Sequence, residues 1–356
     1  MKRNIFIAVL LLFLASLLFS NPAGIDNEPH PYQLKYPPSY GAPPIPKDNP
    51  LTEEGIWLGR LLFYDSLLSI NGKIACGSCH QQQLSFTDGR TLAVGVFGDT
   101  LTRNTMTLIN LAWGKYFFWD GRVRKLEDLI KEPIANPKEM GGLSEKELVQ
   151  RLKNHAHYPE LFRKAFPNDS ISLRSMSKAI SQFLRTIVGE LHDSPEDYKN
   201  FDNRSPEFKA ILTENSMRGA VARVNTMQCY SCHFPARFAA FGGQQLTVYE
   251  EDSIFQAPTL INLRFTAPYK HGGQFATLRD VLKLYNDSMV DFILKNPDIK
   301  LDLSASEIKF TEYDMEHANE IFEPFVDTTI ITNPAFSDPF RQKGFTWYGL
   351  KKDIGK

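Results

Sequence analysis

Residues 74–80, IACGSCH, and residues 227–233, MQCYSCH, carry the same pattern, Cys-x-x-Cys-His, which decides how this chain must fold. The two copies use all four cysteines of the 356-residue chain and two of its eight histidines. At this spacing two thiols can form thioethers with the vinyl groups of one haem, and the adjacent His then reaches the iron. The pattern predicts two covalently bound c-type haems, with the attachment residues Cys76, Cys79 and His80 for one and Cys229, Cys232 and His233 for the other.

Three other uses of paired cysteines explain the pattern less well. A thioredoxin-like redox pair does not require a His directly after both pairs. Zinc sites combine Cys and His pairs at other spacings. Structural disulfides occur in exported proteins, but they leave the repeated His unexplained. The motifs lie about 150 residues apart, which predicts one haem in each of two domains.

The N-terminal residues predict export. Residues 1–19 begin with the positive MKRN and continue as an apolar run of secretory-signal length. The run is short for a membrane span, which needs ~20 apolar residues. Leu18-Phe19-Ser20 is a poor cleavage site, so the leader is either removed or kept as an anchor. We expect a periplasmic protein, and a formal net charge of −1 gives no indication of a nucleic-acid partner.

The hydrophobic pattern predicts a mainly α protein, with two cytochrome c-like haem domains and long irregular loops. Helical spacing follows the N-cap Thr52, and Ser144 with Glu147 forms a capping box. The expected helical segments are 50–69, 143–154, 172–189, 207–225, 276–289 and 306–326. The expected organisation is a leader at 1–20, a Pro-rich tether at 21–50, an N-terminal haem domain at 51–205 and a C-terminal haem domain at 206–356.

Four further motifs connect the chain to a known family. They are FFWDGR (117–122), EPIANPKEMGG (132–142), APTLINLRFTAPYKHGG (257–273) and ATLRDVLKLY (276–285). With them the chain resembles the bacterial di-haem cytochrome c peroxidase family, which includes the MauG-type enzymes, from about residue 45 onward. The resemblance implies a peroxidatic N-terminal haem with His80 as proximal ligand and an electron-transfer C-terminal haem with His233 as proximal ligand.

The resemblance also implies roles for three residues around the N-terminal haem. Trp119 matches the tryptophan between the haems, although a lone Trp is usually a core residue. Glu139 matches the glutamate of the peroxide pocket, where read alone it would be a surface charge. Cleavage of H₂O₂ needs a proton moved from one oxygen to the other, which a carboxylate in a dry pocket can do. Pro133 matches a proline that shapes this pocket.

A calcium ion lies between the haem domains in this family, held largely by carbonyl oxygens and waters. Asn104, Thr266 and Pro268 match its ligand positions. Hard oxygen ligands suit Ca²⁺, but main-chain ligands leave little signature in a sequence. The resemblance therefore implies a Ca²⁺ site whose ligands the residue types alone do not identify.

The chain departs from the standard peroxidases at the second ligand of the C-terminal haem. Standard members carry Met fourteen residues after the His of PYxHxG; here that His is His271, and Tyr285 stands at the ligand position. MauG-type enzymes carry Tyr there. A Tyr ligand stabilises the ferric state, whereas Met raises the potential. Met289, one helical turn later, is the alternative ligand, and plain packing of Tyr285 is the third interpretation.

A second departure concerns the N-terminal haem. Standard members cap it with a distal His, whose place here falls at or near Val96, and residues 81–99 contain no His. His155 and His157 belong to another segment and are expected at the surface. We therefore expect an open, five-coordinate N-terminal haem.

The favoured function is an exported di-haem peroxidase that reduces H₂O₂ with electrons from a small cytochrome c or a cupredoxin. One alternative is MauG-type oxidation of side chains on a partner protein. Two others are a non-catalytic di-haem electron carrier, which predicts two six-coordinate haems, and a haem-based sensor. Whether two copies of the chain form a homodimer stays open.

Overall fold

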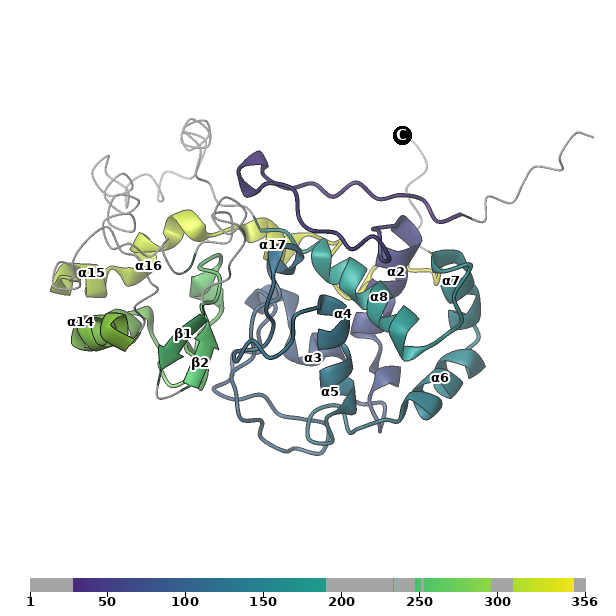
Figure 1. Ribbon diagram of the computed structural model, residues 1–356, viewed down its shortest axis with the longest axis horizontal. Helices are drawn as coiled ribbons and strands as arrows, with labels where there is room; N and C mark the ends of the chain where they lie inside the picture. The colour runs from purple at the N-terminus through teal and green to yellow at the C-terminus, as the bar shows by residue number, and fades with distance from the viewer. Residues whose placement is uncertain (1–27, 190–232, 234–246, 251–252, 296–309, 349–356) are drawn as a thin grey trace, which may run out of the picture.

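The computed structural model describes residues 28–189, 233, 247–250, 253–295 and 310–348 (Figure 1). The leader, the start of the tether, the expected helix 207–225, Cys229 and Cys232 lie outside these residues. The described part is mainly helical, as predicted, and contains one two-stranded antiparallel sheet, β1 (Thr247–Glu250) with β2 (Ser253–Gln256). Among its helices, none is both long and apolar enough to span a membrane.

The N-terminal part is built on the crossing of α2 (Glu53–Tyr64) and α8 (Leu173–Arg185). Helix α2 begins as predicted, because the Thr52 hydroxyl accepts a hydrogen bond from the amide of Gly55 at 3.1 Å. A Cβ at Gly59 would lie 1.9 Å from the carbonyl oxygen of Ala179, so the two backbones touch and only glycine fits. Helix α8 is buried from Ser175 onward. It ends at Arg185, four residues before the end of the predicted segment at Gly189.

Short helices complete this part around the α2–α8 pair. They are α3 (Cys76–Cys79), α4 (Leu126–Leu129), α5 (Lys131–Ala135), α6 (Glu145–Asn154) and α7 (Tyr158–Ala165). The predicted capping box of α6 is confirmed, since Ser144 and Glu147 bond each other's backbone amides.

Residues 28–50 contain no α-helix, only turns and the 3₁₀ helix Pro38–Tyr40, and part of the segment belongs to the core. Tyr40 is buried, its hydroxyl donates to the carbonyl of Gly189 at 3.0 Å, and its ring meets Trp113 edge-on at 5.4 Å. A Pro-rich composition predicts extended backbone but does not tell which of its aromatic side chains are buried.

The C-terminal part lies at the other end of the molecule (Figure 1). It contains the sheet, α14 (Leu278–Lys295), α15 (Glu312–Glu316) and α16 (Ala318–Ile321). Helix α17 (Thr328–Thr332) lies against the N-terminal part, where the Gln82 amide donates to the carbonyl of Ile330 (Figure 1). The single helix expected over 306–326 is broken into α15, α16 and a 3₁₀ turn, Glu323–Phe325. The 3₁₀ turn has proline at its second position, and proline cannot donate the next helical hydrogen bond.

Residues 334–348, named here the C-terminal segment, return to the N-terminal part and lie along α2 (Figure 1). Arg60 donates to the carbonyls of Pro334 and Ser337, and the Tyr64 hydroxyl donates to the carbonyl of Phe336. The Trp57 indole donates to the carbonyl of Trp347 at 2.9 Å. Trp57, Arg60 and Tyr64 share one face of α2, so that face binds the returning chain.

Candidate active site

The first Cys-x-x-Cys-His motif forms α3, with His80 directly after it. Nδ1 of His80 lies 2.9 Å from the carbonyl oxygen of Phe86, which leaves Nε2 to face a ligand. Ser85 and Phe86 have positive φ angles of 52° and 63°, and this left-handed turn brings the carbonyl to the ring. Burial lowers the pKa of His80, which favours the neutral imidazole that a metal ligand must be.

The two thiols of this motif fit haem attachment. Cys76 and Cys79 form no disulfide. Burial, with the charge of Glu139 adding to it, raises the pKa of Cys76 to about 12 and that of Cys79 to about 11. Both thiols are free, as haem attachment requires, because each adds its sulfur to one vinyl carbon and its hydrogen to the other.

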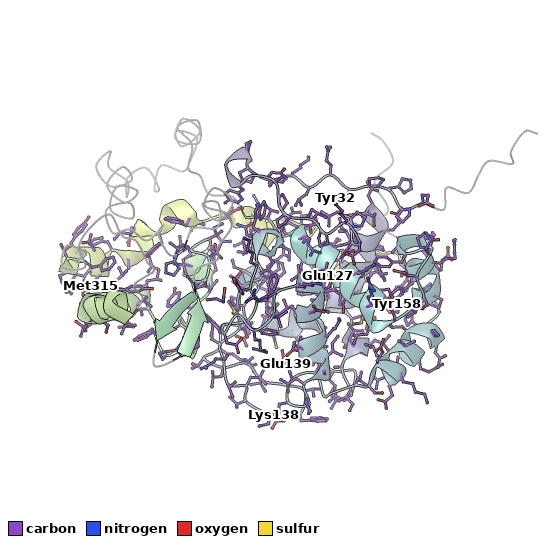
Figure 2. All side chains as sticks on the ribbon, in the orientation of Figure 1. Tyr32, Glu127, Lys138, Glu139, Tyr158 and Met315 are labelled. Atoms are coloured by element: carbon purple, nitrogen blue, oxygen red, sulfur yellow. The ribbon has the colours of Figure 1, made fainter. Side chains whose placement is uncertain are left out.

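Glu139 lies close to this motif, on the loop after α5 (Figure 2). Its partial burial raises the pKa of its carboxyl above the ordinary value, although the bond from Asn136 and the charge of Arg122 lower it. The Asn136 amide donates to Oε2 of Glu139 at 3.3 Å, and the Asn136 carbonyl accepts from the Glu139 amide. A carboxyl held in one orientation with a raised pKa suits proton transfer near neutral pH.

The loop 93–100 packs directly on the backbone of the Glu139 loop. The amide of Val96 donates to the carbonyl of Glu139 at 2.9 Å. A Cβ at Gly95 would lie 1.7 Å from the carbonyl oxygen of Lys138, so glycine is required there. Val96 is buried and the stretch has no His. The buried Val96 thus stands where we expected no histidine, and the absence of a distal ligand at the first haem stays a prediction.

Trp119 joins the two parts of the molecule. Its indole donates to the carbonyl of Asn104 at 2.8 Å, and its own carbonyl accepts from the amide of Gln256 at 2.7 Å. Its ring lies 6.4 Å from that of His271, whose carbonyl accepts from the amide of Asn104 at 2.8 Å. The predicted inter-haem residue therefore contacts segments that lead to both haem motifs.

At the second motif, a tyrosine hydroxyl lies near the ring nitrogen of the motif His that would bind iron. Nδ1 of His233 lies 2.8 Å from the carbonyl oxygen of Pro258, the same arrangement as at His80. Nε2 of His233 lies 3.3 Å from the hydroxyl oxygen of Tyr285 on α14. Burial lowers the pKa of His233, again favouring the neutral ring. The Tyr285 hydroxyl therefore lies within hydrogen-bond reach of the nitrogen that would bind iron, and Tyr285 as a haem ligand stays a prediction; the alternative ligand, the Met289 side chain, lies outside what the structure describes.

The predicted calcium ligands come from neighbouring segments. Asn104 donates to the carbonyl oxygens of Arg90 and Thr91, and Thr266 donates to the carbonyl of Leu263. The Ala267–Pro268 peptide is cis. Within the described residues, no group of three or more His, Cys, Asp or Glu side chains could hold a metal ion. The expected calcium site would use carbonyl and amide oxygens instead of these side chains, so it stays a prediction.

The sequence analysis did not identify the Asn136 side chain or the two backbone carbonyls that orient the site residues. Asn136 orients Glu139, and its place three residues before that carboxyl was a usable signal. The carbonyls of Phe86 and Pro258 orient the two imidazoles, but a backbone oxygen has no residue-type signature. His155 and His157 are partly exposed, as predicted, and both pack on Trp347.

The chain is similar in sequence to proteins of one known family. The family model for di-haem cytochrome c peroxidase matches residues 53–203. The methylamine utilization protein MauG of Methylophilus methylotrophus is 31% identical over 316 residues, 84% of this chain and 91% of that protein. MauG of Methylorubrum extorquens is 34% identical over 259 residues, 68% of this chain and 71% of that protein. The cytochrome c551 peroxidase of Nitrosomonas europaea is 29% identical over 302 residues, 79% of this chain and 84% of that protein.

Solved structures share the fold. A MauG-like protein associated with microbial copper homeostasis superposes with a TM-score of 0.71 at 27% identity, covering 87% of this chain and 100% of that one. The relatives are named as peroxidases or as MauG, and membership brings haem cofactors and oxidoreductase chemistry on peroxide. The chain belongs to the family of di-haem cytochrome c peroxidases that includes MauG.

Proposed function

We propose that this protein is an exported c-type di-haem peroxidase that reduces H₂O₂ at the His80 haem. Glu139 carries the proposal, because it is the carboxyl with a raised pKa beside the free thiols of the first attachment motif. An electron carrier or a gas sensor would have no use for a proton-transfer group at that place.

Cys76 and Cys79 would hold the first haem covalently, and His80 would bind its iron. When bound, the haem supplies the iron that receives a peroxide oxygen and the oxidising power that follows. Glu139 accepts the proton of the oxygen nearer the iron and returns it to the leaving oxygen as water forms. Asn136 holds the carboxyl in place, and the 93–100 loop, which packs on the Glu139 backbone, would bring no His to the iron.

The second haem would be bound by Cys229, Cys232 and His233, with Tyr285 as its second ligand. A phenolate ligand stabilises the ferric state, so this site would hold an oxidising equivalent differently from a His–Met site. Trp119, bonded to segments of both parts, would conduct electrons between the two haems. Asn104, Thr266 and Pro268 would bind Ca²⁺ beside it.

The source of the electrons separates two versions of this function. In the first, a small cytochrome c or a cupredoxin in the periplasm supplies two electrons for each H₂O₂. In the second, the electrons come from side chains of a partner protein. Tyr285 and the missing distal His favour MauG-type haem chemistry, but they do not identify a protein substrate, because a haem ligand sets a potential and not a docking surface.

Peroxide turnover of the haem-loaded protein tests the proposal. We expect H₂O₂ to change the haem spectrum within the mixing time and a reduced small cytochrome c to restore it, with two cytochromes oxidised per peroxide. Restoration by a candidate partner protein, with an oxygen or a crosslink added to it, would favour the second version. A haem spectrum that peroxide leaves unchanged would refute both.

A further inference from the structure

Beside the first haem motif, an aromatic ring on α2 touches the backbone between the two attachment cysteines. A Cβ at Gly77 would lie 2.5 Å from two ring carbons of Tyr64. The Tyr64 hydroxyl donates to the carbonyl of Phe336 at 2.6 Å, which fixes the ring against the motif. Tyr64 therefore lies against the motif that carries Cys76 and Cys79.

The next residue along the chain connects Tyr64 to a second tyrosine. Oδ2 of Asp65 accepts a hydrogen bond from the hydroxyl of Tyr158 at 2.7 Å. Tyr158 is fully buried at the start of α7 (Figure 2), and burial together with Asp65 raises the pKa of its phenol. A phenol at this distance from a carboxylate can lose an electron and pass its proton across the same bond.

Tyr158 leads to a cluster of aromatic rings at the surface. Its ring lies 5.7 Å from Trp347, and Trp347 stacks on His157 at 4.8 Å with the ring planes 21° apart. His155 lies 4.7 Å from both Tyr158 and Trp347. Tyr348, which is 52% exposed, approaches Nδ1 of His157 at 3.5 Å through its hydroxyl. The rings thus run from Tyr158 to solvent, and the hydrogen bond from Tyr158 to Asp65 joins them to the residue that follows Tyr64.

The hydroxyl of Tyr158 exceeds what packing needs. A phenylalanine would fill the same buried space without bringing a hydroxyl out of water. Asp65 needs no tyrosine to hold its turn, because its Oδ1 already caps the turn by accepting from the amide of Leu67 at 2.8 Å. The turn therefore forms without the hydrogen bond between Tyr158 and Asp65.

We propose that Tyr158 and Trp347 form a second electron path, which links the His80 haem site to the surface at Trp347, His157 and Tyr348 and is separate from Trp119. This inference rests on the proposed peroxidase function. In the first step the peroxide-oxidised haem site gains one electron from Tyr158, and the phenolic proton moves to Oδ2 of Asp65. In the second step Trp347 gives one electron to Tyr158, which takes the proton back from Asp65.

The path ends with a one-electron donor in solution, which reduces oxidised Trp347; a small phenol or hydroquinone has suitable chemistry. Two such transfers balance one H₂O₂. Without a donor, Trp347 itself is consumed and gains oxygen from water. The surface cluster would therefore serve small aromatic reductants and, in their absence, draw oxidising equivalents away from the haem.

Oxidation of Trp347 in the haem-loaded, full-length protein tests this path by a readout other than activity. The protein is treated with H₂O₂ without a donor, digested, and analysed by mass spectrometry for oxygen added to Trp347, with Trp113 as internal reference. We expect Trp347 to be oxidised in the wild type and Tyr158→Phe to lower its oxidation about tenfold relative to Trp113. Asp65→Asn, which keeps a hydrogen-bonding side chain, should lower it in the same direction.

Two controls make the outcome decisive. Cyanide, which binds ferric haem iron, should reduce Trp347 oxidation to background, and this separates internal oxidation from attack by bulk peroxide. Turnover with a reduced cytochrome should stay unchanged in Tyr158→Phe. Normal turnover together with unoxidised Trp347, or equal Trp347 oxidation in wild type and Tyr158→Phe, would overturn the path and leave the proposed function intact. A haem spectrum inert to peroxide would instead refute the proposed function.

Discussion

The histidines of the two haem motifs make the same contact through Nδ1, but different residues lie on the other side of each motif. At both, Nδ1 of the motif His meets a backbone carbonyl, of Phe86 for His80 and of Pro258 for His233. Opposite His233 lies the Tyr285 hydroxyl, whereas the residues near the His80 motif include Glu139. Under the proposed function, the two motifs would each bind a haem in the same way, and the residues on the far side would decide between electron storage and peroxide chemistry.

Removing the Glu139 carboxyl should have the largest effect on the difference between the two haem sites. Glu139→Gln keeps the side chain's size and its bond to Asn136 but cannot carry the proton, so we expect peroxide reduction to slow by ~10²–10⁴-fold. Stopped-flow decay of H₂O₂ measures it. Glu132→Gln is the control, since it removes an exposed carboxylate of the preceding helix, α5; a similar loss there would assign the effect to net charge.

The same substitution should not lower stability. The raised pKa means that the folded protein binds the Glu139 proton more tightly than the unfolded chain. That contribution is complete below the unfolded pKa and is lost as pH rises through the folded pKa, so the charged carboxyl is a cost near neutral pH. Urea unfolding at pH 7 should find Glu139→Gln at least as stable as the wild type, and a clear loss would contradict the raised pKa.

Changing Tyr285 sharpens the comparison from the other haem. Tyr285→Phe removes the oxygen that faces His233, so we expect the low-spin ferric signal of that haem to change while the other signal stays. Tyr285→Met should keep six ligands and raise the potential, as measured by redox titration. Tyr269→Phe is the matched control, because the Tyr269 hydroxyl donates only to the carbonyl of Leu263 among the described contacts. An unaltered spectrum in Tyr285→Phe would exclude Tyr285 as ligand.

Gly95→Ala tests the loop that stands in place of a distal His. The new methyl would collide with the carbonyl of Lys138, pushing the 93–100 loop off the Glu139 loop. Overpacking of this kind costs roughly 1–3 kcal/mol, which urea unfolding measures, and peroxide decay should slow with it. Phe97→Ala, at a 64% exposed position in the same loop, should change neither quantity. If Gly95→Ala were as stable as the wild type, the contact would be without consequence.

The smallest expected effect concerns Asn136. Its bond to Oε2 favours the charged Glu139 carboxyl, so Asn136→Ala should raise the pKa of Glu139 further. Because the carboxylate form accepts the peroxide proton, the midpoint of the rate–pH profile should move to higher pH. Asn154→Ala, at the exposed end of α6, should leave the midpoint in place. Movement to lower pH would reverse the role given to Asn136.

Sequence patterns within a few residues predicted the helix ends, whereas contacts between residues far apart in the chain could not be predicted. Thr52, Ser144 and Glu147 cap helices through contacts within three residues, so the sequence was enough. The burial of Tyr40 depends on Gly189, far away in the chain, and no periodicity reports it. At the sites, residue types identified His80, His233 and Tyr285 as candidates. They could not predict that Trp347 returns to Tyr158, because that contact joins residues 189 positions apart.

Electron paramagnetic resonance of the isolated ferric protein, before and after one equivalent of H₂O₂, tests the central claim most directly. The difference between the two haem sites predicts one high-spin signal from the His80 haem and one low-spin signal from the His233–Tyr285 haem, and peroxide should change both. Two low-spin signals that peroxide leaves unaltered would contradict an open site beside Glu139 and leave an electron carrier.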